Sequence, residues 1–146
     1  MYVDEFEREL VILAYDMKNL LRESVAPVCQ EYGLTLQQLH VLIMLQKRPG
    51  VTLSDLSVRA GILRTNFSAI CRKLETHGFI ERRRNDKDRR ACELFVTQKG
   101  HELLGVIEQT VRKQHEQVFA NEPPETFDTI VKGFHALESL IAKARA

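Results

Sequence analysis

The sequence predicts a mainly α fold with a small β component (α+β), and three observations support this prediction. Apolar residues recur at steps of three and four over most of the 146 residues, which is the spacing of amphipathic helices. Residues 79–96 instead contain two short apolar runs of the strand type, separated by a charged segment. Hydrophobic residues make up 44% of the chain, enough for one ordinary domain or for a small domain with an added assembly element.

The first two predicted helices each end close to a proline. The first runs from near the start of the chain to about Ala26, where Pro27 follows. The second runs from about Thr35 to Lys47 and is apolar almost all round, as in a core helix, before Pro49 and Gly50 end it. The apolar stripe of the first helix consists of Phe6, Leu10, Leu13, Met17, Leu20 and Leu21.

Two further helices are predicted to form a helix-turn-helix. Thr52 begins a short helix that Gly61 closes, and Asp55 stands three residues on, at the spacing of a capping box. The next helix runs from about Arg64 to His77, with Gly78 as its C-cap. Residues available for burial are Leu53, Leu56 and Val58 in the short helix and Phe67, Ile70, Cys71 and Leu74 in the longer one.

The segment after Gly78 is predicted to form a β-hairpin with a charged tip. Phe79 and Ile80 lead into the first strand, and apolar residues alternate along the second strand from Cys92 to Val96. A helix-turn-helix with a hairpin attached to it is a winged helix-turn-helix, and we assign residues 35–100 to it.

Two long helices follow the hairpin. The first begins after Thr97, a good N-cap, and ends near Asn121 before Pro123 and Pro124. The last helix carries a stripe from Phe127 to Ile141. A core of this size cannot bury all the stripes of the terminal helices, so we expect residues 1–34 and 101–146 to form a helical dimerisation region of a homodimer.

The helix from Arg64 to His77 presents an unusual outward face. At 100° per residue, this face centres on Thr65, Ala69, Arg72 and Thr76, with Ser68 at its edge. Small and hydrogen-bonding side chains suit a surface that enters a DNA groove and contacts base edges. An ordinary exposed helix face is the alternative interpretation.

Basic residues are concentrated in one part of the chain. Residues 59–90 hold ten Lys or Arg against four Asp or Glu, a local net charge of +6, whereas the whole chain has a net charge of +1. A basic region on a single supersecondary unit points to a polyanionic partner. A solvated arginine-rich loop is the alternative.

The hairpin tip and its second strand carry a specific motif. Asn85, Asp86, Lys87, Asp88, Arg89 and Arg90, followed by Leu94, Val96, Thr97 and Gly100, resemble the Asp-Pro-x-Asp-Arg-Arg and Leu-Thr-x-x-Gly pattern of the MarR family of bacterial winged-helix transcription regulators. The resemblance covers essentially the whole chain in order. Asn85-Asp86 departs from the commoner Asp-Pro, and Leu63 stands where a polar cap is usual.

The resemblance implies a transcription regulator, and a repressor in particular, that binds double-stranded DNA as a homodimer on a pseudo-palindromic operator. In the recognition helix, we expect Thr65, Ser68, Ala69 and Arg72 to contact base edges and Arg64 and Asn66 to contact phosphates or outer bases. In the wing, we expect Arg89 and Arg90 to enter the minor groove and Asp88 to orient them. We expect Arg82, Arg83 and Arg84 to contact phosphates, and Lys87 is a further DNA-binding candidate of the wing.

Family members respond to small aromatic or phenolic ligands, oxidants or metals, and we expect a small-molecule effector. His40 and Met44 are candidate walls of its pocket, although His40 could equally be a satisfied core side chain. Of the three cysteines, Cys29 is the candidate redox thiol. The five histidines show no i, i+4 pair, so a metal site would need distant segments, and we expect neither a metal nor a cofactor.

Other functional classes have less support. The chain contains no Gly-rich phosphate loop, HExxH or GxSxG motif, so we do not expect an enzyme. No apolar stretch approaches the roughly 20 residues of a membrane-spanning helix, and the first residues are acidic, so we expect no membrane contact and a cytoplasmic location. A redox- or metal-responsive regulator and a winged-helix protein-interaction module without specific DNA binding remain alternatives.

Overall fold

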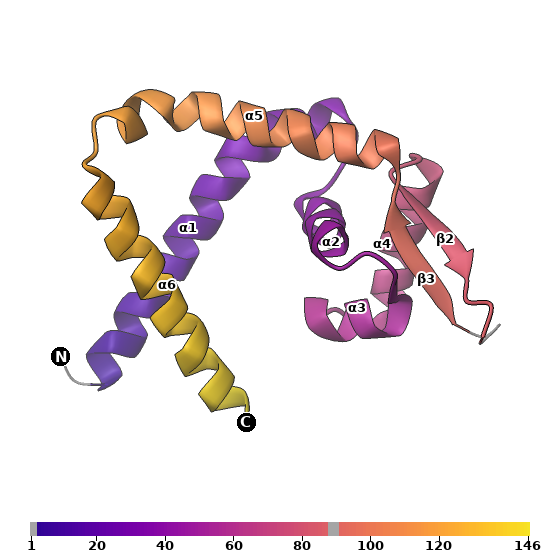
Figure 1. Ribbon diagram of the computed structural model, residues 1–146, viewed down its shortest axis with the longest axis horizontal. Helices are drawn as coiled ribbons and strands as arrows, with labels where there is room; N and C mark the ends of the chain where they lie inside the picture. Colours follow the sequence, from indigo (N-terminus) through magenta and orange to yellow (C-terminus); the bar gives the residue numbers. More distant parts are fainter. Residues whose placement is uncertain (1–2, 88–90) are drawn as a thin grey trace. The chain divides into compact units, whose positions relative to one another are not determined.

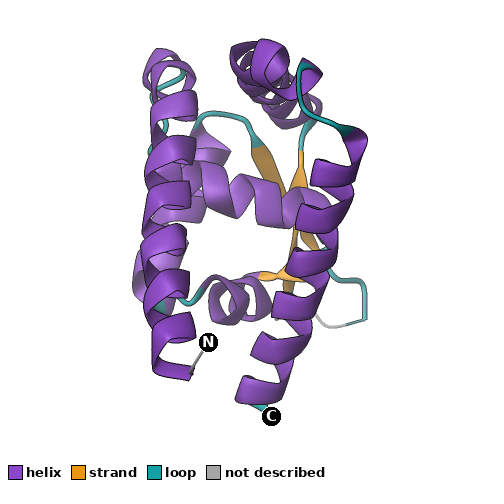
Figure 2. Ribbon diagram, turned by 90° about the vertical axis from the view of Figure 1, so that its left-hand side faces the viewer, coloured by secondary structure: helices purple, strands orange, loops and turns teal. Residues whose placement is uncertain are grey.

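The computed structural model describes residues 3–87 and 91–146 and confirms the predicted mainly α winged helix-turn-helix (Figure 1). The elements in chain order are α1 (Val3–Glu31), α2 (Leu36–Lys47), β1 (Val51–Thr52), α3 (Leu53–Ala60), α4 (Arg64–Thr76), β2 (Ile80–Arg84), β3 (Cys92–Val96), α5 (Gln98–Ala120) and α6 (Pro124–Arg145). Helices dominate and the strands are short (Figure 2). The chain forms two compact units, residues 1–111 and 112–146, and each is described by itself.

Helix α1 continues through Pro27 to Glu31, so the predicted end at Ala26 is wrong. A proline inside a helix removes one N–H donor and costs about 3 kcal/mol. Val25, Val28 and Cys29 are only 4–7% exposed, and burial of such side chains stabilises a helix by about 1.5–3 kcal/mol each. Burial of side chains on both sides of Pro27 therefore offsets the cost of a proline inside the helix, which the sequence pattern alone does not reveal.

Helix α2 begins with a complete capping box. The Thr35 hydroxyl accepts a hydrogen bond from the Gln38 N–H at 3.1 Å, and the Gln38 side chain accepts one from the Thr35 N–H at 3.0 Å. The helix is not buried on all sides as a core helix would be, because His40 and Ile43 are exposed. Its inward face supplies much of the core through Leu39, Val41, Leu42 and Leu45.

Helices α3 and α4 form the predicted helix-turn-helix. The Thr52 hydroxyl caps α3 by accepting from the Asp55 N–H at 3.2 Å, and Gly61 ends α3 in the left-handed region. The expected burial of Val58 is wrong: Val58 is 80% exposed, and Ser57 is buried beside Leu56 instead. In α4 all four predicted inward residues, Phe67, Ile70, Cys71 and Leu74, are buried.

The end of α4 passes directly into the hairpin. Gly78 has a φ of +77°, and its N–H and that of Phe79 bond to the Glu75 and Leu74 carbonyl oxygens, both at 2.9 Å. This is the Schellman arrangement, in which glycine avoids the strain that a side chain would add. The three strands are antiparallel in the order β1-β3-β2, and Arg82 pairs with Leu94 while Arg83 pairs with Glu93.

The start of α5 is fixed against the end of α4. The Thr97 hydroxyl accepts from the Gly100 N–H at 3.1 Å and donates to the Gly78 carbonyl oxygen at 2.5 Å. A Cβ atom on Gly100 would lie 2.3 Å from the Phe79 carbonyl oxygen. Only glycine therefore allows this close approach, which positions the hairpin relative to α5.

The second unit, residues 112–146, contains the end of α5 and all of α6. Phe119 and Phe127 meet edge to face with ring centroids 5.8 Å apart, and Pro124 opens α6 at its first turn. No residue of α6 is buried. The predicted stripe is present but stays exposed at Ile130, Val131, Phe134, Leu140 and Ile141.

Candidate nucleic-acid interface

The outward face of α4 has the composition that the sequence predicted. Thr65, Ala69 and Arg72 are exposed, and Ser68 is partly buried. The opposite face is anchored by Phe67, Cys71 and Leu74, which are fully buried. Because one side of α4 is fixed in the core, the other side presents a rigid row of small and hydrogen-bonding groups.

The N-terminus of α4 carries charge but no side-chain cap. Leu63 is the N-cap residue and makes no side-chain hydrogen bond to the helix. Arg64 and Asn66, in the first turn, are exposed. Unpaired N–H groups and the helix dipole favour an anion at such a terminus, and Arg64 adds a full positive charge beside it.

A polar cavity of about 380 Å³ lies where α3, α4 and the hairpin meet. The start of α3 contributes two hydroxyl groups, α4 contributes Arg64 and Ser68, and the hairpin contributes Arg82. Two arginines and three hydroxyl-bearing residues therefore line one space, a combination that suits an anionic group such as a phosphate. The full lining is Thr52, Leu53, Ser54, Arg64, Ser68, Arg82, Ala91 and Cys92.

The three consecutive arginines of β2 do not share one face of the hairpin. Side chains paired directly across antiparallel strands lie on the same face. Arg82 pairs with the fully buried Leu94, and Arg84 pairs with Cys92, so both lie on the face that continues into the core. Arg83 pairs with Glu93 and lies on the opposite face.

Arg82 is held by the recognition helix. Its Nε donates to the Glu75 carboxylate at 2.5 Å, and both side chains are about one-third exposed (35% and 30%). An ion pair that exposed contributes about 0–1 kcal/mol to stability, so its main effect is orientation. The pair connects the last turn of α4 to the first half of β2.

Arg83 is engaged on the far side of the hairpin. It donates to the Glu81 carboxylate from both Nε, at 3.0 Å, and a terminal nitrogen, at 2.5 Å. Its guanidinium also lies over the Phe95 ring, 4.3 Å from the centroid. Of the three arginines, only Arg84 has no ion pair within residues 3–87 and 91–146.

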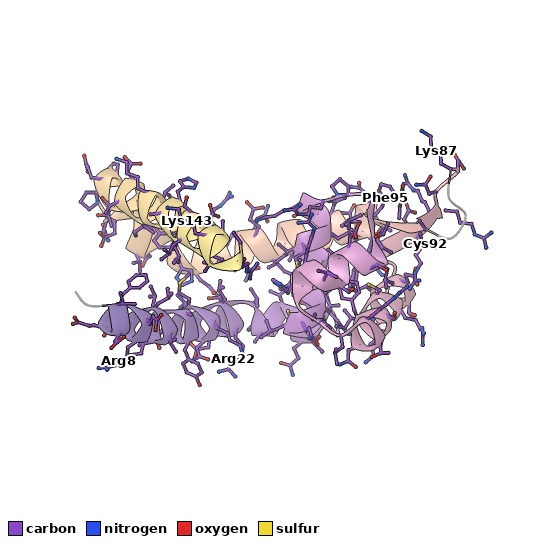
Figure 3. The ribbon with its side chains drawn as sticks, turned by 90° about the horizontal axis from the view of Figure 1, so that it is seen from below. Arg8, Arg22, Lys87, Cys92, Phe95 and Lys143 are labelled. Carbon is purple, nitrogen blue, oxygen red and sulfur yellow. The ribbon has the colours of Figure 1, made fainter. Side chains whose placement is uncertain are left out.

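The outer end of the hairpin is described only in part. Lys87 lies there, beyond Cys92 and Phe95 of β3 (Figure 3), and its backbone N–H bonds to the Asn85 side-chain oxygen at 2.9 Å. Asn85 in turn donates to Glu93 at 3.0 Å. The predicted minor-groove arginines, Arg89 and Arg90, and the predicted orienting residue Asp88 lie outside the described residues.

The candidate effector residues lie apart from the cavity at α4. His40 is exposed, which rules out the interpretation of His40 as a core side chain, and Met44 is partly buried. A second cavity of about 170 Å³ lies between the end of α2, the hairpin and the start of α5, and neither residue lines it. Its lining residues are Leu45, Gln46, Pro49, Arg83, Phe95, Val96 and His101.

Two of the three thiols are buried. Cys29 is 4% exposed, and burial raises the pKa of its thiol above the usual value. Burial also raises the pKa of Cys71 to about 11, although the nearby positive charge of Arg82 opposes this. Reactive thiols are exposed and have a lowered pKa. The structure thus argues against the prediction that Cys29 is a redox thiol.

Within residues 3–87 and 91–146, no helix is long and apolar enough to cross a membrane. Within the same residues, no group of three His, Cys, Asp or Glu lies close enough to hold a metal ion.

The sequence pattern did not identify three residues of this interface. Thr52 and Ser54 line the cavity, and Glu75 holds Arg82. Strand alternation could have separated Arg83 from Arg82 and Arg84, because the side-chain period of a strand is two. The contact of Glu75 with Arg82 depends on how the helix meets the hairpin, which the spacing of residues does not specify.

These features define the class of the protein as a winged helix-turn-helix with a basic cavity beside its recognition helix. Comparisons with known proteins show which family the chain resembles. The family model described as MarR family matches residues 32–91. The transcriptional repressor MprA of Escherichia coli K12 is 37% identical over 97 residues, which cover 65% of this chain and 55% of MprA.

Two further proteins extend the likeness over more of the chain. The homoprotocatechuate degradative operon repressor of Escherichia coli is 27% identical over 116 residues, covering 80% of this chain and 76% of that protein. The repressor CouR, solved on a 23-mer DNA duplex, is 26% identical with a TM-score of 0.67, covering 100% of this chain and 99% of CouR. The chain resembles the MarR family over residues 32–91, and it spans little more than half the length of MprA.

Proposed function

We propose that the protein is a sequence-specific DNA-binding transcription regulator that acts as a homodimer on a pseudo-palindromic operator. The observation that carries this proposal is the outward face of α4, where Thr65, Ala69 and Arg72 stand exposed on a helix whose opposite face is buried. CouR binds a DNA duplex in its solved structure. Repression is the proposed mode, since MprA and CouR are both repressors.

Each group of residues has a proposed role in this interface. Thr65, Ser68, Ala69 and Arg72 contact base edges in the major groove, where donors, acceptors and the thymine methyl group differ between base pairs. Arg64 and Asn66 contact phosphates or outer bases. The cavity between Arg64 and Arg82 receives a backbone phosphate, because it combines two positive charges with the hydroxyl groups of Thr52, Ser54 and Ser68.

The pairing of β2 with β3 changes which wing residues we propose to contact DNA. Arg84 and Lys87 remain candidate phosphate contacts, since Arg84 lies on the same hairpin face as Arg82 and Lys87 is exposed at its outer end. Arg83 is no longer favoured, because it faces the other way and is engaged by Glu81 and Phe95. Minor-groove insertion by Arg89 and Arg90, oriented by Asp88, stays part of the proposal.

The homodimer is supported by exposed apolar surface on the terminal helices. Monomers rarely expose large contiguous apolar patches. The exposed apolar residues are Phe6, Val11, Ile12, Leu13, Tyr15, Met17, Leu20 and Leu21 in α1, and Ile130, Val131, Phe134, Leu140 and Ile141 in α6. We propose that residues 1–34 and 101–146 form the dimerisation region that spaces the two copies of residues 35–100.

We further propose that a small phenolic acid modulates DNA binding, with His40 and Met44 in its pocket. The homoprotocatechuate degradative operon repressor supports this class of effector by its name. Titrating homoprotocatechuate into the complex of protein and operator would test it, and release of DNA is the expected result. No release, with no heat of binding to the free protein, would contradict this effector class.

Redox control through Cys29 and metal control are less favoured. Cys29 is buried with a raised pKa, so little of it is thiolate near neutral pH. No observation in the described part of the chain supports a metal site, and none favours a protein-interaction module over DNA binding.

The test of the main proposal is selection of duplexes from a randomised pool, followed by titration of the enriched sequence at several salt concentrations. We expect an inverted repeat whose half-sites lie about one helical turn, roughly 34–36 Å, apart. Binding should weaken as salt rises, with a slope that reports the number of phosphate contacts. Absence of any enriched sequence would contradict the proposal.

A further inference from the structure

The recognition helix lacks the cap that its neighbours have. In the same winged helix-turn-helix, Thr35 caps α2 and Thr52 caps α3 through their hydroxyl groups. Leu63 occupies the equivalent position of α4, and its backbone is that of a true N-cap, because its carbonyl oxygen accepts from the Phe67 N–H at 2.9 Å. Serine, threonine, aspartate and asparagine are strongly preferred at this position.

Packing does not explain this leucine. Leu63 is 74% exposed, more than any other large apolar side chain of the helix-turn-helix except Val58. A single exposed leucine is ordinary on a protein surface. Here, however, the exposed leucine also leaves the helix without the hydrogen bond that a polar residue would supply, and a local rule broken without compensation in the fold points to a functional site.

The position of Leu63 indicates what it contacts. In a helix-turn-helix, the N-terminal residues of the recognition helix contact base edges in the major groove. The edges there carry hydrogen-bonding groups on every base pair, and the one apolar group is the C5-methyl of thymine. Arg64, the next residue, lines the cavity proposed for a phosphate, so Leu63 stands where the helix end meets the DNA.

We propose that Leu63 is a specificity-determining residue that contacts the C5-methyl group of a thymine in each operator half-site. This inference rests on the proposed function, since it requires that α4 enters the major groove. The exposed leucine gains apolar contact in the complex, whereas the free protein forgoes the cap. Leu63 therefore lowers the stability of the free protein and raises its affinity for DNA, and both quantities can be measured.

The direct test uses the operator recovered by duplex selection and replaces each thymine of the half-site with deoxyuridine, which removes only the methyl group. At one thymine position, replacement by deoxyuridine should lower the affinity of the unchanged protein by about fourfold for each half-site replaced. A fourfold change corresponds to the burial of one methyl-sized group. Leu63→Ala should lower affinity for the thymine operator by a similar factor and lose its sensitivity to deoxyuridine at that position.

Three further variants separate contact from folding. Leu63→Ser restores a capping hydroxyl, so its melting temperature should rise by about 2–4 °C while its affinity falls as in Leu63→Ala. Leu63→Met keeps an apolar side chain and should retain the sensitivity to deoxyuridine. Val58→Ser removes an apolar side chain that is 80% exposed on α3, and it should change neither the affinity nor the thymine dependence.

The outcomes distinguish this inference from the function on which it rests. If the unchanged protein enriches no duplex, the proposed function fails and the inference fails with it. If the protein binds its operator but loses the same affinity with deoxyuridine whether residue 63 is leucine or alanine, only the inference is overturned. A half-site without thymine, or an unchanged affinity in Leu63→Ala, would overturn it as well.

Discussion

Helices α4 and α6 both carry an apolar stripe at helical spacing, yet only α4 buries it within its own unit. Phe67, Cys71 and Leu74 of α4 are fully buried. Phe134 and Ile141 of α6 are 43–44% exposed, and no residue of that helix is buried. The same apolar periodicity therefore occurs on a helix face that its own unit buries and on a helix face that stays exposed.

The comparison separates two kinds of stability. Residues 1–111 contain the core cluster, which includes the buried face of the recognition helix. Residues 112–146 have no such core, so their helices gain most by association. Substitutions in the first unit should change the free energy of unfolding, while substitutions on the stripe of α6 should change the dimer dissociation constant.

The largest effect is expected at Gly100, where the core of the first unit is tightest. A Cβ atom there would lie 2.3 Å from the Phe79 carbonyl oxygen, so Gly100→Ala should lower the free energy of unfolding by about 3 kcal/mol. Gly105, in the same helix, has open space around the same position, and Gly105→Ala should raise stability by about 0.5–1 kcal/mol. Urea denaturation of both variants measures this, and equal effects would contradict the packing argument.

A charge on the stripe of α6 should act on assembly instead. Phe134→Asp should raise the dimer dissociation constant by a factor of about 30, or about 2 kcal/mol, because it places a carboxylate where apolar contact is expected. Ala136 is exposed on the opposite face of α6, so Ala136→Asp is the matched control and should leave the dimer intact. Sedimentation velocity at several protein concentrations distinguishes them, and a dimer unaffected by Phe134→Asp would exclude α6 from the interface.

The outer face of α4 should matter for DNA and not for folding. Arg72 is exposed, so Arg72→Ala should leave the free energy of unfolding within about 0.5 kcal/mol but weaken operator binding by about 1–2 kcal/mol and relax the preference at one base pair. Lys73→Ala removes a neighbouring exposed positive charge from the same helix and serves as the control. Binding of Arg72→Ala to randomised duplexes tests the prediction, and an unchanged sequence preference would remove Arg72 from the set of base contacts.

Sequence patterns predicted the elements of this fold well where local chemistry determines them. Thr35, Thr52 and Thr97 begin helices as expected, and Gly61 and Gly78 end them. The failures have a common cause in tertiary packing. Pro27 does not end α1, because Val28 and Cys29 beyond it are buried, and His40 is exposed although its neighbours in α2 are apolar.

The candidate site was predictable in its residue types but not in its pairings. Composition and helical spacing were enough to select the α4 residues, and charge clustering selected the hairpin. The cavity formed by Thr52, Arg64 and Arg82 joins three separate elements, and no spacing rule connects them. The different surroundings of Arg82 and Arg83 likewise follow from strand register, which depends on how β2 pairs with β3.

The smallest expected effect concerns the ion pair that joins α4 to the hairpin. Both side chains are about one-third exposed, so Glu75→Gln and Arg82→Ala should each change the free energy of unfolding by less than about 1 kcal/mol. Their effects on DNA binding distinguish two roles for Arg82. If Arg82 contacts a phosphate directly, Arg82→Ala should lower the salt slope by about 0.9, while Glu75→Gln, which frees the guanidinium, should leave the slope unchanged or raise it.

If Arg82 instead acts by orienting the hairpin against α4, both variants should weaken binding with little change in slope, and the double variant should be no weaker than either single one. Arg83→Ala is the control, because Arg83 faces away from Arg82 and pairs with Glu81. The short contact to Glu75 favours the orienting role for the free protein, and the cavity beside it favours phosphate binding once DNA arrives. A Glu75→Gln variant that binds operator more tightly than the unchanged protein would show that the Glu75 carboxylate competes with DNA for Arg82. The ion pair would then hold the hairpin in the free protein and would break when Arg82 binds DNA.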